Sequence, residues 1–528
     1  MSRVDTAWLR MDNDVNLMMI VGVWLLAPAI TLAALRERIE SKLLKYDRFR
    51  QKAVHDALGA MWVDDESFDL DRHVVATPLP REKGQGERAA LQALCGRLAA
   101  EPLDPERPLW KFHLIEHYEG GSAILMRIHH CIGDGIALMT VMLSITDGGA
   151  DPPRRRRNLA AAAEAHHGAG DGHEGDWLSD AVLKPLTDLT VKAIGMTGSG
   201  IGRSMEVLAN PQALTQGMGG VDLAQAGLQV AKDAAALALL DDDSPTRLKG
   251  KGSGRKVVAW CEPIPLEMVK AIGKAMNCTV NDVLLSCVAG AIGGWLRASG
   301  EDLAGKEIRA MVPVNLRPLD KAWQLGNRFG LAPLVLPVGI ANPVQRMYAV
   351  HARMAEMKGS YQPLLAFAIL SVSGLLIKPV QDMVLGLFAK KTTAVMTNVP
   401  GPAKPLLFCG STLRQTMFWV PSSGDIGVGV SVLSYGGGVQ FGLITDEKLC
   451  PRPQEIIDRF EPEFEQLLLV AMMLPWAGEP AGETASTPAA GPPAQQPAAR
   501  PKNKAASNAA VRRPKQPPNP ANEGKPAP

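Results

Sequence analysis

The stretch AILMRIHHCIGDGIALM, Ala123–Met139, is the part of this chain that decides its fold and chemistry. A strand-like apolar run ends on the doublet His129-His130, and a helix-like apolar run follows Asp134-Gly135. Neutral imidazole accepts a proton near neutral pH, so a histidine doublet where a strand gives way to a turn predicts general-base chemistry on a hydroxyl group. We expect Asp134 to shape this turn by its charge and Gly135 by its backbone freedom.

Length and composition predict an ordinary globular protein of more than one domain. The 528 residues exceed a single core, so two domains with appendages are expected. The apolar content of 46% and the charged content of 21% are typical of a globular chain, and the net charge of +2 gives no reason to expect a nucleic-acid partner. Seven scattered cysteines without a Cys-x-x-Cys pair predict a reduced, cytoplasmic protein without a disulfide framework or a zinc ribbon.

Changes in composition along the chain predict its division into segments. Short apolar strands alternate with amphipathic helices in the first part, which indicates a layered α/β fold. The second part contains a periodic helix over Val280–Ser299, an alternating run over Ile426–Asp446 that predicts a β-hairpin, and a helix over Pro453–Met473. We predict an α/β domain over 1–150, a linker with crossover helices over 151–255, a second α/β domain over 256–475 and a disordered, basic, Pro/Ala-rich tail over 476–528.

Two apolar segments raise the question of contact with a membrane. Leu17–Leu35 is nineteen residues without a charge, which is long enough to span a bilayer. Pro28 divides this segment, so we expect a buried strand followed by a helix, with a membrane span as the alternative. Leu364–Leu376 is too short to span a bilayer and is expected to line a channel, to contact a lipid interface or to be part of the core.

Five further motifs accompany HHxxxDG in a fixed order. They are MWVDDESFDLDRHV (Met61–Val74), RPLW (Arg107–Trp110), VNDVLLS (Val280–Ser286), MVPVNLRP (Met311–Pro318) and TNVPGP (Thr397–Pro402). Together the six motifs resemble the bacterial wax ester synthase/acyl-CoA:diacylglycerol acyltransferase family of the CoA-dependent acyltransferase superfamily, over about Val4–Met473. The resemblance implies an α/β fold of two chloramphenicol-acetyltransferase-like domains that face each other across a central channel, with HHxxxDG in mid-channel.

The resemblance also implies an activity and the residues that perform it. The activity is transfer of a long-chain acyl group from acyl-CoA to diacylglycerol or a fatty alcohol, with acyl-CoA as a substrate and no bound cofactor. His130 corresponds to the general base, and His129 is expected to orient its neighbours or to line the channel. The family pattern pairs Asp134 with an arginine, and Arg317 falls at the matching position; a catalytic triad of Asp134 with His130 is the alternative.

Asn281 and Asp12 are two further candidate residues of the site. Asn281 stands at the start of a helix, where its amide or a nearby backbone N–H steadies an oxyanion, or where it caps the helix. Asp12 falls where the family usually has Glu, and its role is open. No metal site is expected, because His129, His130 and Asp134 lack further Cys or His ligands at zinc-binding spacing.

A lipid acceptor predicts where the protein works. We expect a cytoplasmic protein that associates peripherally with the inner membrane face or with lipid inclusions; the sequence does not indicate an oligomeric state. One alternative is a condensation-type domain that forms amides from carrier-bound thioesters, against which stands the absence of a carrier segment on this chain. The other is a lipid-binding protein without catalysis, against which stand the intact His130, Asp134 and Asn281.

Overall fold

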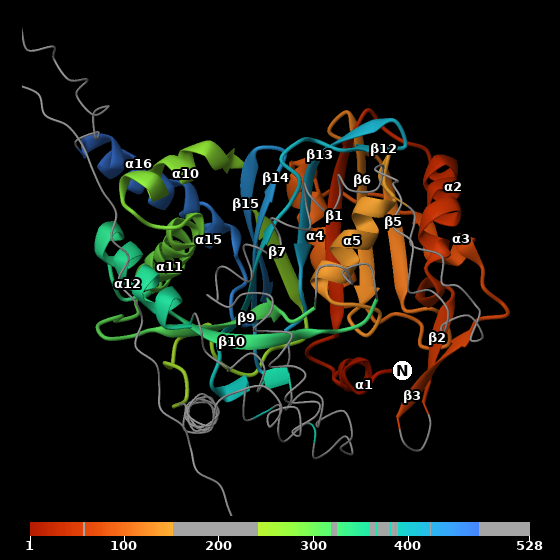
Figure 1. Cartoon of the computed structure of the whole chain (residues 1–528), viewed down its shortest axis with the longest axis horizontal. Helices are drawn as coiled ribbons and strands as arrows, with labels where there is room; N and C mark the ends of the chain where they lie inside the picture. Colours follow the sequence, from red (N-terminus) through yellow and green to blue (C-terminus); the bar gives the residue numbers. More distant parts are fainter. Residues whose placement is uncertain are drawn as a thin grey trace, which may run out of the picture. The chain divides into compact units, whose positions relative to one another are not determined.

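Two β-sheets with helices packed on them form the described structure (Figure 1). In this computed structural model, contacts group Met1–Trp476 into one unit and Ala477–Pro528 into another. The structure describes residues 1–55, 59–150, 241–317, 325–357, 366–367, 381, 386, 389–422 and 424–474. The predicted tail, the predicted crossover helices before residue 241 and most of Leu364–Leu376 lie outside these residues.

The first sheet has six strands in the order β12-β13-β1-β6-β5-β4. Two of its strands come from the second half of the sequence, so the sheet joins segments about 390 residues apart (Figure 1). The helices of this half are α1 (Arg3–Arg10), α2 (Leu32–Lys42), α3 (Leu70–His73), α4 (Glu87–Ala99) and α5 (Gly135–Ser144). The strands are β1 (Met19–Ala27), β4 (Val74–Ala76), β5 (Trp110–Tyr118), β6 (Gly121–His129), β12 (Leu407–Phe408) and β13 (Ser411–Trp419).

The uncharged segment Leu17–Leu35 contains the central strand of this sheet. β1 pairs antiparallel with β13 on one side and with β6 on the other, and it is buried from Met19 to Leu26. A strand that is covered on both faces reads as a continuous apolar run, which explains the absence of charge. The predicted buried strand, followed after Pro28 by α2, is confirmed, and the alternative of a membrane span is wrong.

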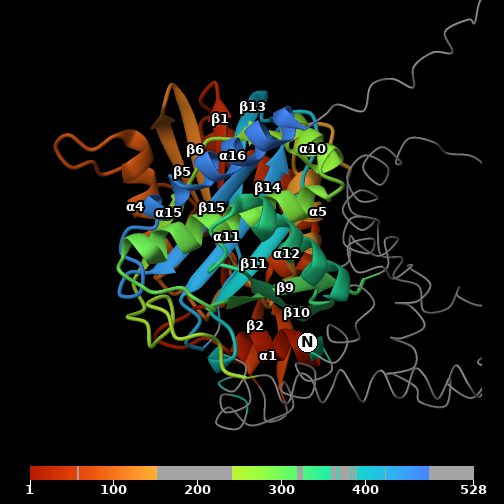
Figure 2. The ribbon, with the colours of Figure 1, turned by 90° about the vertical axis from the view of Figure 1, so that its left-hand side faces the viewer.

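The second sheet has seven strands, in the order β10-β9-β11-β14-β15-β7, with β8 also paired to β15. These are β7 (Lys256–Trp260), β8 (Ile264–Pro265), β9 (Ile308–Asn315), β10 (Phe329–Leu336), β11 (Ala394–Pro400), β14 (Val428–Tyr435) and β15 (Gly438–Asp446). Its helices are α10 (Leu266–Ala275), α11 (Val280–Ala298), α12 (Pro343–Met357), α15 (Gln454–Ile457) and α16 (Phe460–Met473), and α11, α15 and α16 lie over the sheet (Figure 2).

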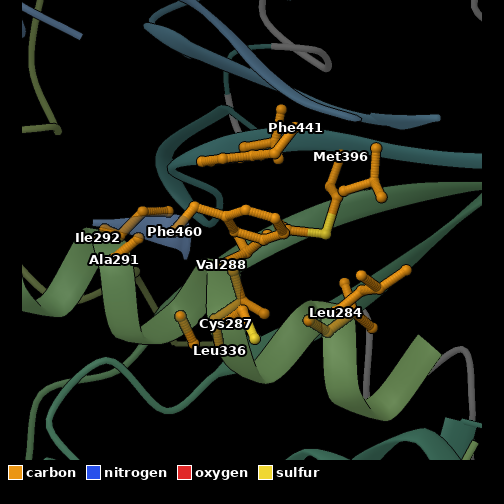
Figure 3. Packing of buried hydrophobic residues seen from close by; sticks show 14 of the residues in the cluster. Leu284, Cys287, Val288, Ala291, Ile292, Leu336, Met396, Phe441 and Phe460 are labelled. Carbon is orange, nitrogen blue, oxygen red and sulfur yellow. The ribbon is translucent and has the colours of Figure 1, made fainter. Parts of the chain in front are cut away.

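The hydrophobic cores follow the two sheets. α2 and α5 share one core with the first sheet, while α4 packs on its other face together with Trp260 and Trp419. α11 is buried along most of its length, and its Val288 and Ile292 lie beside Phe460 in the second core, which also contains Leu284 and Phe441 (Figure 3). Burial of this kind supplies most of the free energy of folding.

Several predicted elements are present, and one is wrong in detail. The alternating run Ile426–Asp446 forms the antiparallel pair β14–β15, as predicted, and the periodic helix at Val280 is α11. The predicted single helix over Pro453–Met473 is two helices, because α15 ends at Ile457 and α16 begins at Phe460.

None of the described helices is by itself long and apolar enough to cross a bilayer. The consecutive helices α10 and α11 reach the necessary length and composition only together, and they are bent by 102° at the break between them.

A third, two-stranded sheet stands apart from the other two. β2 (Gln51–His55) and β3 (Ala60–Asp64) form a hairpin that projects from the first half of the molecule, near α1 (Figure 1). Two short 3-10 turns, Leu43–Lys45 and Asp47–Phe49, lead into it from α2.

Candidate active site

The histidine doublet lies where β6 ends, and β1 fixes its position. His129 is the last residue of β6 and pairs with Met19, and the backbone N–H of His130 donates to the carbonyl of Met18 at 2.7 Å. Asp134 caps α5, since its Oδ1 accepts from the backbone N–H of Ala137 at 2.9 Å. Asp is a favoured N-cap residue because its carboxylate satisfies a helix N–H that has no partner within the helix. The predicted sequence of strand, turn and helix is therefore present.

Both nitrogens of His129 are occupied. Nδ1 accepts from the backbone N–H of Cys131 at 3.1 Å, and Nε2 lies 3.3 Å from Oδ1 of Asp12. Burial lowers the pKa of His129, but the sulfur of Cys131 and the carboxylate of Asp12 outweigh burial and raise the pKa to about 10. The neutral ring uses its one lone pair on the Cys131 N–H, and the protonated ring has none. His129 thus has no free lone pair in either state.

His130 has the opposite surroundings. Its ring is stacked on Trp8, with centroids 4.1 Å apart and an interplanar angle of 17°, and Phe329 lies 5.5 Å away. No described residue forms a hydrogen bond with its buried Nδ1. Burial lowers the pKa of His130 to about 4, against a smaller raising effect of Asp134. The ring is therefore neutral at physiological pH and able to accept a proton.

Asp134 joins the turn to the second half of the chain. Its Oδ2 accepts from Nη2 of Arg317 at 2.8 Å and from the backbone N–H of Arg328 at 2.9 Å. Arg317 also donates to the carbonyl of Gly326 at 2.5 Å, and both partners of the ion pair are almost fully buried. Arg317, the partner that the resemblance implies, is thus in contact with Asp134. With both oxygens engaged in this way, the carboxylate forms no bond with the ring of His130.

The structure corrects the expectations for two residues. Gly135 is the first residue of α5 and does not have a positive φ, so the turn does not need its backbone freedom. No atom lies within 4 Å of the position that a Cβ would take there, and the residue borders open space. Asn281 does not cap α11, because the cap is Thr279, in a capping box with Asp282. Oδ1 of Asn281 instead accepts from Nδ2 of Asn398 on β11 at 2.9 Å.

Three residues of the site escaped the sequence analysis. Trp8 comes from α1, and Asn327 and Phe329 come from the start of β10 and the residues before it. Nδ2 of Asn327 donates to the carbonyl of His130 at 2.8 Å and to Oδ1 of the buried Asp5 at 2.9 Å. No local pattern marks these residues, because their contacts join segments 120 to 320 positions apart in the chain.

A cavity of about 550 Å³ borders the doublet. Asp12 and His129 lie in its wall, and His130 is not among the residues that line it. Much of the remaining wall is apolar and includes Leu9, Leu17, Met19, Leu103 and Leu109, and β2 contributes Lys52, Ala53, Val54 and His55. Apolar walls with a few polar groups that orient the ligand are common in pockets for small molecules.

The described residues contain one group with the side chains of a metal site, and it lies on other elements. Ligand atoms of Cys278, Asp282 and His351 lie within 4.8 Å of one another, at the start of α11 and on α12. Asp282 already accepts from the backbone N–H of Thr279 at 2.8 Å and lies 2.7 Å from Nδ1 of His351. The capping box and this pair account for the cluster without a metal ion.

Comparison with known proteins gives matches over most of the chain. Residues 1–284 match the family model of the wax ester synthase/diacylglycerol acyltransferase catalytic domain, and residues 325–468 match that of the WS/DGAT C-terminal domain. A Mycobacterium tuberculosis H37Rv protein named probable diacylglycerol O-acyltransferase is 26% identical over 459 residues, which cover 84% of this chain and 90% of that protein.

Solved structures share the fold. The wax ester synthase/diacylglycerol acyltransferase from Marinobacter aquaeolei VT8 has a TM-score of 0.58 and 20% identity, over 90% of this chain and 100% of that one. The first condensation domain of the calcium-dependent antibiotic synthetase has a TM-score of 0.53 and 15% identity, over 90% and 96%. The two family matches span most of the sequence, including HHxxxDG, and this chain therefore belongs to the wax ester synthase/diacylglycerol acyltransferase family of acyltransferases.

Proposed function

We propose that this acyltransferase moves a long-chain acyl group from acyl-CoA to the hydroxyl of diacylglycerol or of a fatty alcohol, and that His130 is its general base. The product is triacylglycerol or a wax ester. The support comes from the family, from relatives that are named as diacylglycerol O-acyltransferases and from the cavity beside the doublet, whose wall includes several large apolar side chains.

The state of the two histidines carries this proposal. His129 has no lone pair to offer, because its ring is engaged by Cys131 and Asp12. His130 is neutral, since burial lowers its pKa to about 4, and its Nδ1 has no partner among the described residues. A base needs a free lone pair and a neutral ring, and only the second histidine has both.

The reaction balances without a covalent intermediate on the protein. The acceptor oxygen attacks the thioester carbonyl as His130 takes the hydroxyl proton, and the tetrahedral intermediate collapses to ester and CoA thiolate. The imidazolium then returns the proton to the thiolate. Asn281 is the candidate donor to the oxyanion, and Asp134 is assigned to the Arg317 pair that fixes the turn. Asp12 is proposed to hold His129 in place.

A lipid acceptor implies work at a lipid surface. We propose that the protein is cytoplasmic and associates peripherally with the inner membrane face or with lipid inclusions. A diacylglycerol that stays in a monolayer can then enter the cavity without crossing water, which would cost about 25 cal/mol for each Å² of exposed apolar surface.

Thiol release tests the proposal. Purified protein with palmitoyl-CoA should release free CoA only when hexadecanol or diacylglycerol is present, and the ester should appear in equal amount. His130→Ala should lower turnover by about 10²- to 10⁴-fold, the usual contribution of a general base. His117→Ala is the matched control, since His117 is an exposed histidine on β5. Full activity of His130→Ala, or thiol release without any acceptor, would contradict the proposal.

A further inference from the structure

The β2–β3 hairpin has an outward face on which three of the four side chains are apolar. Lys52 pairs with Val63 and Val54 with Met61, so these four side chains share one face of the hairpin. Val54, Met61 and Val63 are 38%, 46% and 37% exposed. We call these four residues the outer face. Large apolar side chains that are exposed side by side mark a surface that binds something.

The other face of the hairpin is anchored to the protein. Ala53 and Trp62, which pair with each other, pack against the core of the first sheet. The guanidinium of Arg48 lies over the ring of Trp62, 5.1 Å from its centroid. The inner face therefore packs on the hydrophobic core, and the outer face is the side of the hairpin that points away from it.

The outer face is continuous with the cavity beside the doublet. Val54 and Lys52 belong both to the outer face and to the cavity wall, which also contains His129 and Asp12. The same short strand therefore joins an exposed apolar surface to the cavity that His129 and Asp12 border.

We propose that the outer face of the β2–β3 hairpin docks on a lipid monolayer with anionic headgroups and delivers the lipid acceptor to the cavity. This inference rests on the proposed function for the delivery step, whereas the docking step stands on the hairpin alone. Val54, Met61 and Val63 enter the acyl region, and Lys52, the one charged member of the face, lies at headgroup level. Apolar side chains with a neighbouring cation are typical of interfacial anchors.

A lipid surface fits this face better than a second copy of the chain does. Stable dimers bury roughly 800 Å² on each partner, which is far more than four side chains of one hairpin offer. Reversible binding to a monolayer can use a smaller area, and its strength grows with the apolar area that is buried and with the attraction of Lys52 to anionic headgroups.

Vesicle binding by the full chain tests the docking step. The variant Met61→Gln/Val63→Thr removes apolar surface but leaves the cavity wall intact. The matched control is Met268→Gln/Leu407→Thr, which changes two similarly exposed apolar residues on the separate elements α10 and β12. With vesicles of phosphatidylcholine and phosphatidylglycerol, the hairpin variant should bind at least tenfold more weakly and the control within twofold of the natural chain. Val63→Leu should strengthen binding without lowering the melting temperature, which separates added apolar surface from unfolding.

Activity measurements separate this inference from the proposed function. The hairpin variant should lose activity on diacylglycerol in vesicles in proportion to its lost binding, and it should keep activity on dissolved 1-octanol. If the natural chain binds vesicles through the hairpin but releases no thiol from acyl-CoA, the proposed function is contradicted and the docking inference is unaffected. The docking inference would be overturned if the hairpin variant bound vesicles as well as the natural chain does. It would also be overturned if sedimentation showed that the natural chain is a dimer and the hairpin variant a monomer, since the outer face would then be a dimer contact.

Discussion

Two adjacent imidazoles, His129 and His130, meet opposite electrostatic surroundings although they share one turn. Asp12 contacts the first ring and the indole of Trp8 covers the second. Burial excludes water from the second ring and so favours its neutral state. We therefore expect Trp8 to act as a positioning residue, which shields His130 from water and holds the plane of its ring.

The pH dependence of activity tests the role of Trp8. With the pKa of His130 near 4, kcat/KM should stay level from pH 8 down to about 5, whereas an ordinary histidine would lose activity below about 6.5. Trp8→Leu admits water and should move the acidic inflection of the profile towards 6.5; Trp8→Phe keeps a ring there and should move it less. A uniform loss of activity at every pH in Trp8→Leu would assign Trp8 a structural role only.

The same shift has a consequence for stability, and its sign follows from proton uptake. Between pH 6.5 and about 4 the unfolded chain binds a proton at His130 that the folded protein does not bind. The free energy of unfolding therefore falls as the pH drops from 6.5 to about 4, because of His130. Above pH 6.5 both states are neutral at His130, and this residue then has no effect on the pH dependence of stability.

At the scale of elements, the start of α11 holds a capping residue, Thr279, and the candidate oxyanion donor, Asn281. Thr279 closes the capping box, so Thr279→Ala should lower the free energy of unfolding by about 1 kcal/mol and leave kcat unchanged. Asn281→Ala should lower kcat with a smaller effect on stability if its amide steadies the oxyanion. Thermal melting and thiol release on both variants decide the matter. Equal kcat in the two variants would remove Asn281 from the catalytic machinery.

Elements whose signal is local could be predicted from the sequence. The alternation in Ile426–Asp446 around Gly436-Gly437 specifies the β14–β15 hairpin, since both glycines have a positive φ in the turn. The break between α15 and α16 was missed, because apolar periodicity continues across Asp458 and Arg459. The pairing of β13 with β1 has no local signal either, because strand order is settled by contacts between distant segments.

The candidate site divides in the same way. His129, His130 and Asp134 could be predicted as site residues because they lie in the single motif HHxxxDG. Arg317 could be predicted because the family resemblance pairs Asp134 with an arginine in the motif MVPVNLRP. Trp8 and Asn327 were missed, because a packing contact across the turn leaves no pattern in either segment. The chemistry of this site could be read from its motifs, and the surroundings that tune its pKa values could not.

At the scale of the whole molecule, the ion pair of Asp134 with Arg317 ties the two halves of the chain together at the site. Both side chains are nearly inaccessible to water, and Arg317 follows β9 of the second sheet while Asp134 precedes α5 of the first half. Each charge depends on the other, because a buried charge without its partner costs several kcal/mol.

A double-mutant cycle tests whether this pair holds the halves in register. Asp134→Asn and Arg317→Met should each lower the free energy of unfolding by about 3–5 kcal/mol, because each leaves one buried charge unpaired. The double variant should be more stable than the sum of the two losses predicts, since it has no unpaired charge left. Its activity should nevertheless stay low, because the double variant lacks the bonds of the Arg317 side chain to position 134 and to Gly326, and only the contacts of Asn327 and of the backbone then hold the turn of His130 to residues 326–328. Thermal melting of the single and double variants measures the coupling free energy between the two residues, and thiol release measures the activity. Strictly additive losses of stability would show that the two residues act separately, and a double variant with natural turnover would show that catalysis does not depend on the link between the halves.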